Sequence, residues 1–168
     1  MRLFILILLP FLCIFLQTSV FSFLSIGGVV PDILLIFVVF YAILNKSPAA
    51  VTYGFLCGLL EDLFTGSMIG CNALAKGAAA YVISRLQVQV FKENLFVGVL
   101  GVFVATIINS FIMLLIFLAI DKSIVLNTTL ITGIGYQVLY NVVLAAPVYW
   151  IYQRSSQTGW LMPTRKDL

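Results

Sequence analysis

The sequence predicts an all-α protein, a polytopic membrane helix bundle of about six transmembrane helices with both termini in the cytoplasm. Of its 168 residues, 62% are hydrophobic and only 9% are charged, far from the balance of a soluble domain. A helix needs about 20 mostly apolar residues to cross a bilayer, and apolar segments of that kind occupy nearly the whole chain. We therefore expect one helical bundle over residues 1–152 and a short basic cytoplasmic tail over residues 153–168.

The segment boundaries follow from break signals in the sequence. Gly27 and Gly28 interrupt the chain before the second segment, where Pro31 suits the first turn of a helix. Pro48 opens the third segment, and the fourth is shorter and richer in small residues. The six predicted helices are Leu3–Leu24, Ile26–Leu44, Pro48–Phe64, Met68–Ser84, Leu95–Ile120 and Val125–Tyr152.

Positive charge lies almost entirely on one side of this predicted bundle. With the N-terminus inside, the cytoplasmic connections hold Arg2, Lys46, Arg85, Lys92, Arg154, Arg165 and Lys166. The outer connections hold only Lys122. Because cytoplasmic loops carry the lysine and arginine, this asymmetry predicts an even number of crossings. A re-entrant fourth segment would disturb that balance, and a cleaved signal peptide is disfavoured because the first apolar run reaches Leu24.

The residue types that most often catalyse or bind metals are scarce. There is no histidine, and the three cysteines, Cys13, Cys57 and Cys71, are odd in number and scattered. This pattern matches neither a disulfide framework nor a C-x-x-C metal site, and histidine is the commonest metal ligand and general base. We expect a non-enzymatic protein with no cofactor or metal, in contact with the lipid bilayer and membrane partners rather than nucleic acid.

The stretch "GLLEDLFTGSMIGCNALAKG" places three charges inside apolar helices. The predicted hairpin turns near Gly66 and Gly70, so Asp62 and Lys76 lie at similar depths on facing helices. Because a charge in the bilayer interior costs roughly 2.5 to 3.5 kcal/mol, we expect these two to form a buried ion pair. Glu61 would point about 100° away, toward the outer head groups.

Small residues accompany these charges. Gly54 and Gly58 are spaced four apart and share a helix face with Asp62, which predicts a groove that another helix can approach closely. On the following predicted helix, Asn72 shares a face with Lys76. Two interpretations of the region stay open: a pair that only fixes helix register, or a site that binds a partner or ligand.

Neutral polar residues mark the other helices. Asn109 and Gln137 reach similar depths in the last two segments, which predicts an interhelical hydrogen bond, and Asn141 follows one turn later. Asp32 is expected to cap the second helix at its outer end. With Glu61 and Asp62 it would make that end acidic, so that it could receive a basic segment of a partner.

Two stretches, taken in order, resemble the MreD family of bacterial rod shape-determining membrane proteins. They are "PDILLIFVVFYAIL" and "GFLCGLLEDLFTGSMIGCNALAKG", which together fall within residues 31–84. In the second, glycines, an aspartate, a Ser/Thr-Gly turn and a Gly-x-Asn-Ala-Leu sequence follow the family pattern. Glu61 stands where the family more often has glutamine, and Lys76 is not part of the pattern. The matching positions are Pro31, Asp32, Gly54, Gly58, Asp62, Gly66, Gly70 and Asn72.

The resemblance implies a multi-pass protein of the bacterial inner membrane that supports cell shape and side-wall peptidoglycan synthesis. It would act as a scaffold of the elongasome, working with MreC, MreB, RodA and a penicillin-binding transpeptidase. One alternative is a vitamin-binding subunit of an energy-coupling-factor transporter, with Asp62, Lys76, Asn109, Gln137 and Asn141 lining its pocket. An intramembrane enzyme would instead need Asp32 and Asp62 to converge on one water.

Overall fold

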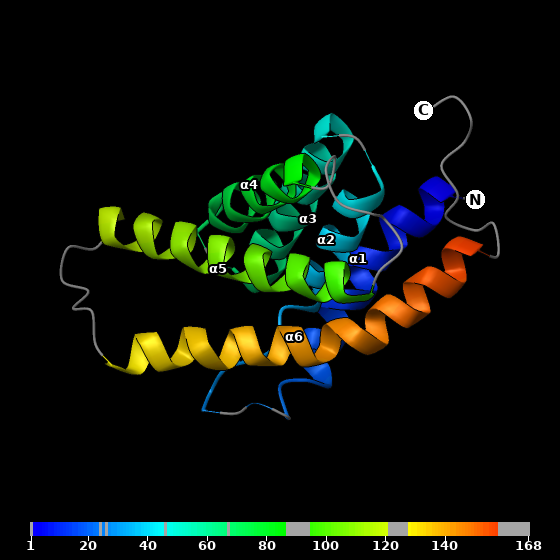
Figure 1. Cartoon of the computed structure of the whole chain (residues 1–168). Helices are drawn as coiled ribbons and strands as arrows, with labels where there is room; N and C mark the ends of the chain where they lie inside the picture. The colour runs from blue at the N-terminus through cyan, green and yellow to red at the C-terminus, as the bar shows by residue number, and fades with distance from the viewer. Residues whose placement is uncertain are drawn as a thin grey trace.

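The computed structural model is a bundle of α-helices. It describes residues 2–23, 25, 27–45, 47–66, 68–86, 95–120 and 128–157, and the side chains at 2–3, 128–129 and 151–157 are not included. Six helices lie within these residues, as the apolar segments predicted (Figure 1). They are α1 (Arg2–Ser19), α2 (Ile33–Leu44), α3 (Ser47–Thr65), α4 (Cys71–Leu86), α5 (Leu95–Ile120) and α6 (Thr128–Gln157).

Two of the described helices, Leu95–Ile120 and Leu130–Trp150, are long and apolar enough to cross a membrane by themselves. The apolar parts of α1 and α2 are shorter. The start of α1 and the end of α6 lie at the same end of the bundle (Figure 1), as an even number of passes requires. Six crossings and cytoplasmic termini stay predictions. Several residues behind them, Lys46, Lys92, Lys122 and residues 158–168 of the tail, lie outside the described residues.

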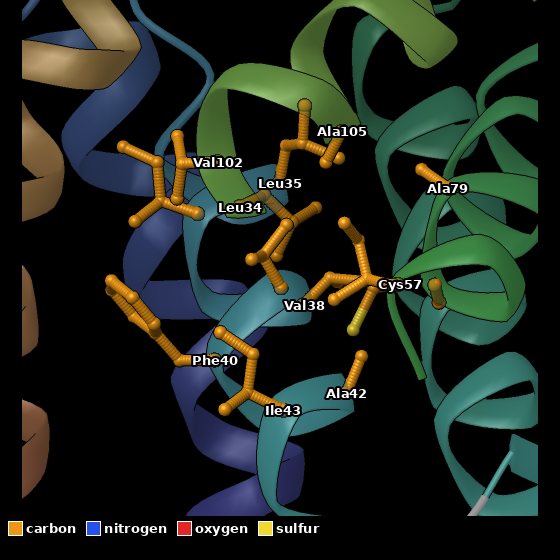
Figure 2. Close-up of a cluster of buried hydrophobic side chains, with 14 of the residues drawn as sticks. Leu34, Leu35, Val38, Phe40, Ala42, Ile43, Cys57, Ala79, Val102 and Ala105 are labelled. Atoms are coloured by element: carbon orange, nitrogen blue, oxygen red, sulfur yellow. The ribbon is translucent and has the colours of Figure 1, made fainter. Parts of the chain in front are cut away.

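Helix α2 forms the centre of the bundle and contacts each of the other five described helices. Nine of its 12 residues are buried, and its sequence is apolar on every face, the composition expected of a fully enclosed helix. Figure 2 shows Leu34, Leu35 and Val38 of α2 pointing toward Val102 and Ala105 of α5 and Cys57 of α3. The apolar core is therefore built around α2.

The chain breaks before α2, and the break is longer than the sequence predicted. Gly27 and Gly28 adopt positive φ angles of 62° and 79°, which glycine reaches without strain. The helix begins at Ile33, after the predicted first turn around Pro31. Asp32 is its N-cap: the Asp32 side chain accepts the Leu35 N–H, which fixes the start of the helix at this position. Nonhelical backbone at 29–32 is thus partly or fully buried in the bundle.

Helices α3 and α4 form the predicted hairpin, and it turns where expected. Gly66 and Gly70 have positive φ angles of 64° and 105°. The predicted groove also exists, but α4 of the same chain fills it. A Cβ on Gly54 would lie 2.9 Å from the Lys76 carbonyl oxygen, and a Cβ on Gly58 would clash with the backbone of Asn72 and Ala73. The groove is an internal seam, so it does not serve as an open site for another protein.

We expect Gly58→Ala to destabilise the protein by about 1 to 3 kcal/mol, because the added methyl group meets rigid backbone in a tight seam. The control is Gly77→Ala, a helical glycine on the facing helix whose Cβ would make an ordinary 3.5 Å contact with Phe55. Thermal unfolding in detergent micelles measures both variants. Equal melting temperatures for the two would contradict the seam.

Candidate functional site

The Lys76 ammonium lies in the interior of the bundle, with none of its side chain exposed. Its Nζ is 2.6 Å from Asp32 Oδ2 and 2.6 Å from Glu61 Oε2. The predicted buried ion pair therefore exists, but the partners are different: the carboxylates that bind the lysine are Asp32 and Glu61 rather than Asp62. Glu61 is 5% exposed, so the prediction that it faces the outer head groups is wrong.

Asp32 connects this ion pair to the start of α2. Its Oδ1 accepts the Leu35 N–H at 2.8 Å, while Oδ2 binds the lysine. Its own backbone N–H donates to Asn141 Oδ1 of α6, also at 2.8 Å. The carboxylate thus completes the first turn of α2 where the helix dipole favours negative charge. The predicted cap is correct, but it is buried inside the bundle instead of forming part of an acidic outer end.

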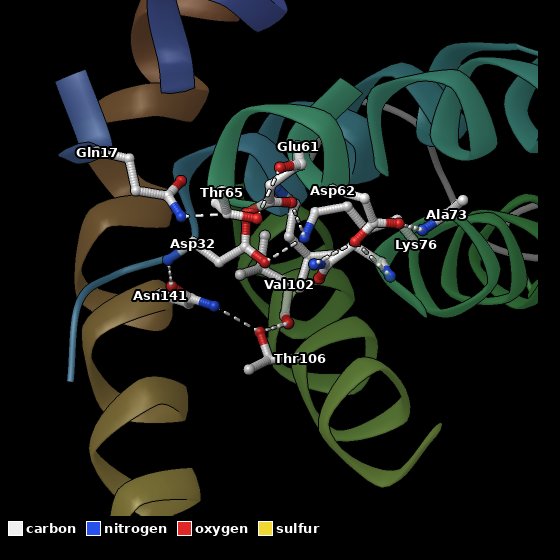
Figure 3. Close-up of polar contacts among 12 residues, drawn as sticks. Gln17, Asp32, Glu61, Asp62, Thr65, Ala73, Lys76, Val102, Thr106 and Asn141 are labelled. Carbon is white, nitrogen blue, oxygen red and sulfur yellow. Dashed lines mark hydrogen bonds and ion pairs between the residues drawn. The ribbon is translucent and has the colours of Figure 1, made fainter. Parts of the chain in front are cut away.

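The hydrogen bonds continue from these residues to the remaining helices. Asn141 Nδ2 donates to Thr106 Oγ1 of α5 at 3.1 Å, and that hydroxyl donates to the Val102 carbonyl. On the other side, Gln17 Nε2 of α1 donates to Glu61 Oε1 at 3.2 Å. Six residues are connected in this way: Gln17, Glu61, Lys76, Asp32, Asn141 and Thr106. We call them the polar chain, and it reaches all six described helices (Figure 3).

Asp62 caps α4 across the hairpin turn. Its side chain accepts the backbone N–H groups of Gly70, Asn72 and Ala73 at 2.8 to 3.3 Å. The Asn72 side-chain amide also donates to it, at 2.9 Å. A carboxylate at this position satisfies donors that the first turn of a helix otherwise leaves free. Asp62 points inward, as predicted, but its bonds are to the start of α4.

The remaining predicted polar contact does not form as expected. Asn109 is 4% exposed, and its Oδ1 accepts no hydrogen bond among the described residues. The bond between α5 and α6 is made instead by Asn141 and Thr106, and Gln137 is only half-buried. The predicted Asn109–Gln137 bond is therefore replaced by a pair one turn closer to Lys76.

The sequence analysis missed Gln17 and Thr106, the two ends of the polar chain. Each is a single neutral polar residue in an apolar helix, a pattern that does not separate an internal contact from a tolerated surface position. In the structure, both lie in register with buried apolar residues. Thr106 lies one turn after Val102 on the face of α5 that is fully buried, and Gln17 lies one turn after Cys13 on the buried side of α1.

These side chains bind one another and the helix ends beside them. Within the described residues, no group of three or more His, Cys, Asp or Glu residues could hold a metal ion. The three cysteines are reduced and buried. Asp32 and Asp62 bind different partners, the former the lysine and the latter the α4 backbone. What the arrangement does chemically is neutralise charge and satisfy helix ends inside an apolar bundle.

A family model for the rod shape-determining protein MreD matches residues 1–154, nearly the whole chain. The chain belongs to the MreD family. It is therefore a rod shape-determining protein of a membrane protein family, as the motif in residues 31–84 indicated. No curated protein and no solved structure matched the chain.

In this MreD protein, the positions that carry the family resemblance have clear structural roles. Asp32 and Asp62 each cap a helix, and Asn72 binds the second of them. Gly54 and Gly58 let α3 and α4 touch, while Gly66 and Gly70 form the turn between them. Pro31 is buried just before the α2 cap. The motif positions thus specify the α3–α4 hairpin and the start of α2, which packs against it.

We expect Lys76→Met to destabilise the protein by about 3 to 5 kcal/mol, because it leaves the buried Asp32 and Glu61 carboxyl groups without their cation. Arg85→Met is the matched control, since it removes the same charge from an exposed position of the same helix. Melting in detergent measures both. The triple change Lys76→Met, Asp32→Asn, Glu61→Gln should recover part of the loss, and no recovery would contradict the electrostatic cause.

We expect Asp62→Ala to cost about 0.5 to 2 kcal/mol, the range for loss of a helix N-cap, and therefore less than Lys76→Met. Thr65→Val is the control, because Thr65 lies at the same end of α3 but is exposed, and its hydroxyl donates to the Glu61 carbonyl of its own helix. Hydrogen exchange of the first turn of α4 should rise in Asp62→Ala. Unchanged exchange there would show that the cap is dispensable.

Proposed function

We propose that this MreD family member is a non-enzymatic scaffold of the elongasome, which holds other membrane proteins of side-wall peptidoglycan synthesis in place. The observation that supports this most directly is the polar chain. Its ion pairs and hydrogen bonds connect all six described helices to one another, so they serve the rigidity of the bundle. A rigid, mostly apolar body is what a membrane scaffold requires.

The partner surface in this proposal lies on the outside of the bundle. The Gly54 and Gly58 groove is filled by α4, so a partner helix has to bind a lipid-facing side instead. Large apolar side chains cover three such sides. They are Phe4, Phe11 and Phe15 on α1, Phe96, Phe103 and Phe111 on α5, and Ile131, Leu139 and Val143 on α6. The family resemblance implies MreC as the partner, with MreB, RodA and a penicillin-binding transpeptidase in the same assembly.

The proposal places the chain in the bacterial inner membrane as a multi-pass protein with both termini in the cytoplasm. The asymmetry of lysine and arginine between alternate connections supports this orientation. The position of the first and last helix ends at one end of the bundle supports an even number of passes (Figure 1).

The structure gives little support to the vitamin-transporter alternative. Of the residues expected to line its pocket, Lys76 and Asn141 belong to the polar chain and Asp62 caps α4. Their hydrogen-bonding groups are directed at other residues of the chain. We therefore do not propose a small-molecule site at these positions.

The scaffold proposal predicts that one exposed side captures an MreC-like protein in living cells. A photo-crosslinking amino acid is placed singly at Phe15 on α1, Phe111 on α5 or Leu139 on α6, all exposed, and at the buried Val102 as the control. Captured proteins are identified by mass spectrometry. We expect capture from one side or from two adjacent sides, and none from Val102.

Failure to capture an MreC-like protein from all three sides, in cells whose rod shape the labelled protein still supports, would contradict the proposal. Where capture occurs, alanine at the capturing phenylalanine or leucine should weaken co-purification without lowering the melting temperature. Because these side chains are exposed, their loss affects the partner contact and leaves the bundle intact.

A further inference from the structure

The ion cluster at the centre of the bundle has an uneven count of charges. Asp32 and Glu61 bring two carboxyl groups to the single ammonium of Lys76, and all three side chains are buried. With both carboxyl groups ionised, the cluster would carry one uncompensated negative charge among apolar helices. A buried charge without compensation is strongly unfavourable and is usually removed by taking up a proton. The charge count alone therefore points to one bound proton.

A second, independent observation concerns hydrogen bonds. Gln17 Oε1 and Glu61 Oε2 are both buried and both lack a hydrogen-bond partner. The two atoms belong to side chains that already share one bond, from Gln17 Nε2 to Glu61 Oε1 at 3.2 Å. Glu61 Oε2 lies 2.6 Å from the Lys76 ammonium, a contact that satisfies charge but is not a well-directed hydrogen bond. Gln17 Oε1 therefore lacks a donor, on a side chain whose amide nitrogen already contacts the Glu61 carboxyl group.

A proton on Glu61 Oε2 supplies that donor. A protonated carboxyl group has one O–H to donate and an oxygen that still accepts. Paired with a primary amide, it can form two parallel hydrogen bonds. In one, the amide N–H donates to the carbonyl oxygen of the acid, and in the other, the acid O–H donates to the amide oxygen. We propose that the Asp32–Glu61–Lys76 cluster binds one exchangeable proton, held on Glu61 and donated to Gln17 Oε1, which attaches α1 to α3. The same proton balances the charge of the cluster.

Glu61 is a better site for this proton than Asp32. Both Asp32 carboxyl oxygens already have partners, since Oδ1 accepts the Leu35 N–H and Oδ2 binds the Lys76 ammonium. The Glu61 side chain receives a side-chain amide and the shared ammonium. The titratable groups that interact with it are Asp32 before α2, Lys76 of α4 and the thiol of Cys57 on its own helix, and Cys13 of α1 interacts in turn with Asp32 and Cys57.

The consequence is a proton-dependent attachment of α1. With the proton in place, the cluster is neutral and Gln17 makes two bonds to α3. Without it, one of these bonds is lost and an extra negative charge lies beside α1. Because Gln17 is near the end of α1, the packing of this helix against α3 would respond to the pH of the compartment that exchanges protons with the cluster.

Infrared spectroscopy of the full chain tests the proposal directly, because a protonated carboxyl group has a carbonyl band well separated from those of carboxylates and amides. The protein is measured near neutral pH in an alkyl maltoside detergent, whose head group contains no carbonyl. We expect one such band in the unmodified protein, its loss in Glu61→Gln, and its retention in Asp62→Asn. The latter is the matched control, a neighbouring buried carboxylate bound by backbone donors.

The bond to Gln17 has its own signature. Gln17→Leu removes the acceptor, so the band should move to higher frequency, as it does when a carboxyl O–H loses its partner. The absence of the band in the unmodified protein would overturn the proposal, and this measurement needs no variant to fold. A band that survives in Glu61→Gln would overturn the assignment to Glu61, and a band unmoved in Gln17→Leu would overturn the attachment of α1.

Discussion

The bundle depends on the ion pairs of one buried ammonium, that of Lys76. The two carboxyl groups that contact it belong to Glu61 of α3 and to Asp32, the N-cap of α2, so three helices meet at a single nitrogen atom. Asp32 then leads through Asn141 to α6 and α5, and Glu61 leads through Gln17 to α1. In an apolar environment an unpaired charge costs several kcal/mol, which makes separation of α2, α3 or α4 from the cluster unfavourable.

The break before α2 is what allows this arrangement. Nonhelical backbone is tolerated at depth in a membrane protein only where its polar groups find partners inside the protein. Here Asp32 provides the partner for the first turn of α2, and Asn141 provides the partner for the Asp32 N–H. The nonhelical backbone at 29–32 thus brings the Asp32 carboxyl group into the interior of the bundle. A helix that continued through these residues would have left it near the end of the bundle.

The sequence predicted the helices well and the central contacts less well. Long apolar runs between glycine and proline breaks define α3, α4 and α5 to within a few residues. A long apolar run bounded by such breaks predicts a helix and little else. The glycine positions of the hairpin were also informative, since both turn glycines have positive φ angles. The depth of Asp32 was predicted wrongly. The start of α2 depends on the capping hydrogen bond from the Leu35 N–H to Asp32, and a hydropathy pattern does not predict such a bond.

The choice between Glu61 and Asp62 was wrong for a related reason. Adjacent residues point about 100° apart, which suggested that only one of them could face protein. Both faces of α3 are enclosed, however, one by the start of α4 and the other by the Lys76 cluster with α1. A periodicity argument assumes one buried face, and a helix packed on several sides does not satisfy that assumption.

The shortness of α2 has a consequence for biogenesis. Its 12 residues extend about 18 Å, well under the roughly 30 Å of a bilayer's hydrocarbon layer. Such a segment is a poor independent unit for insertion, and its buried N-terminus becomes satisfied only when α4 and α6 are present. Because α6 follows the other five described helices in the chain, the Asn141 bond to Asp32 can form only after α6 has been synthesised.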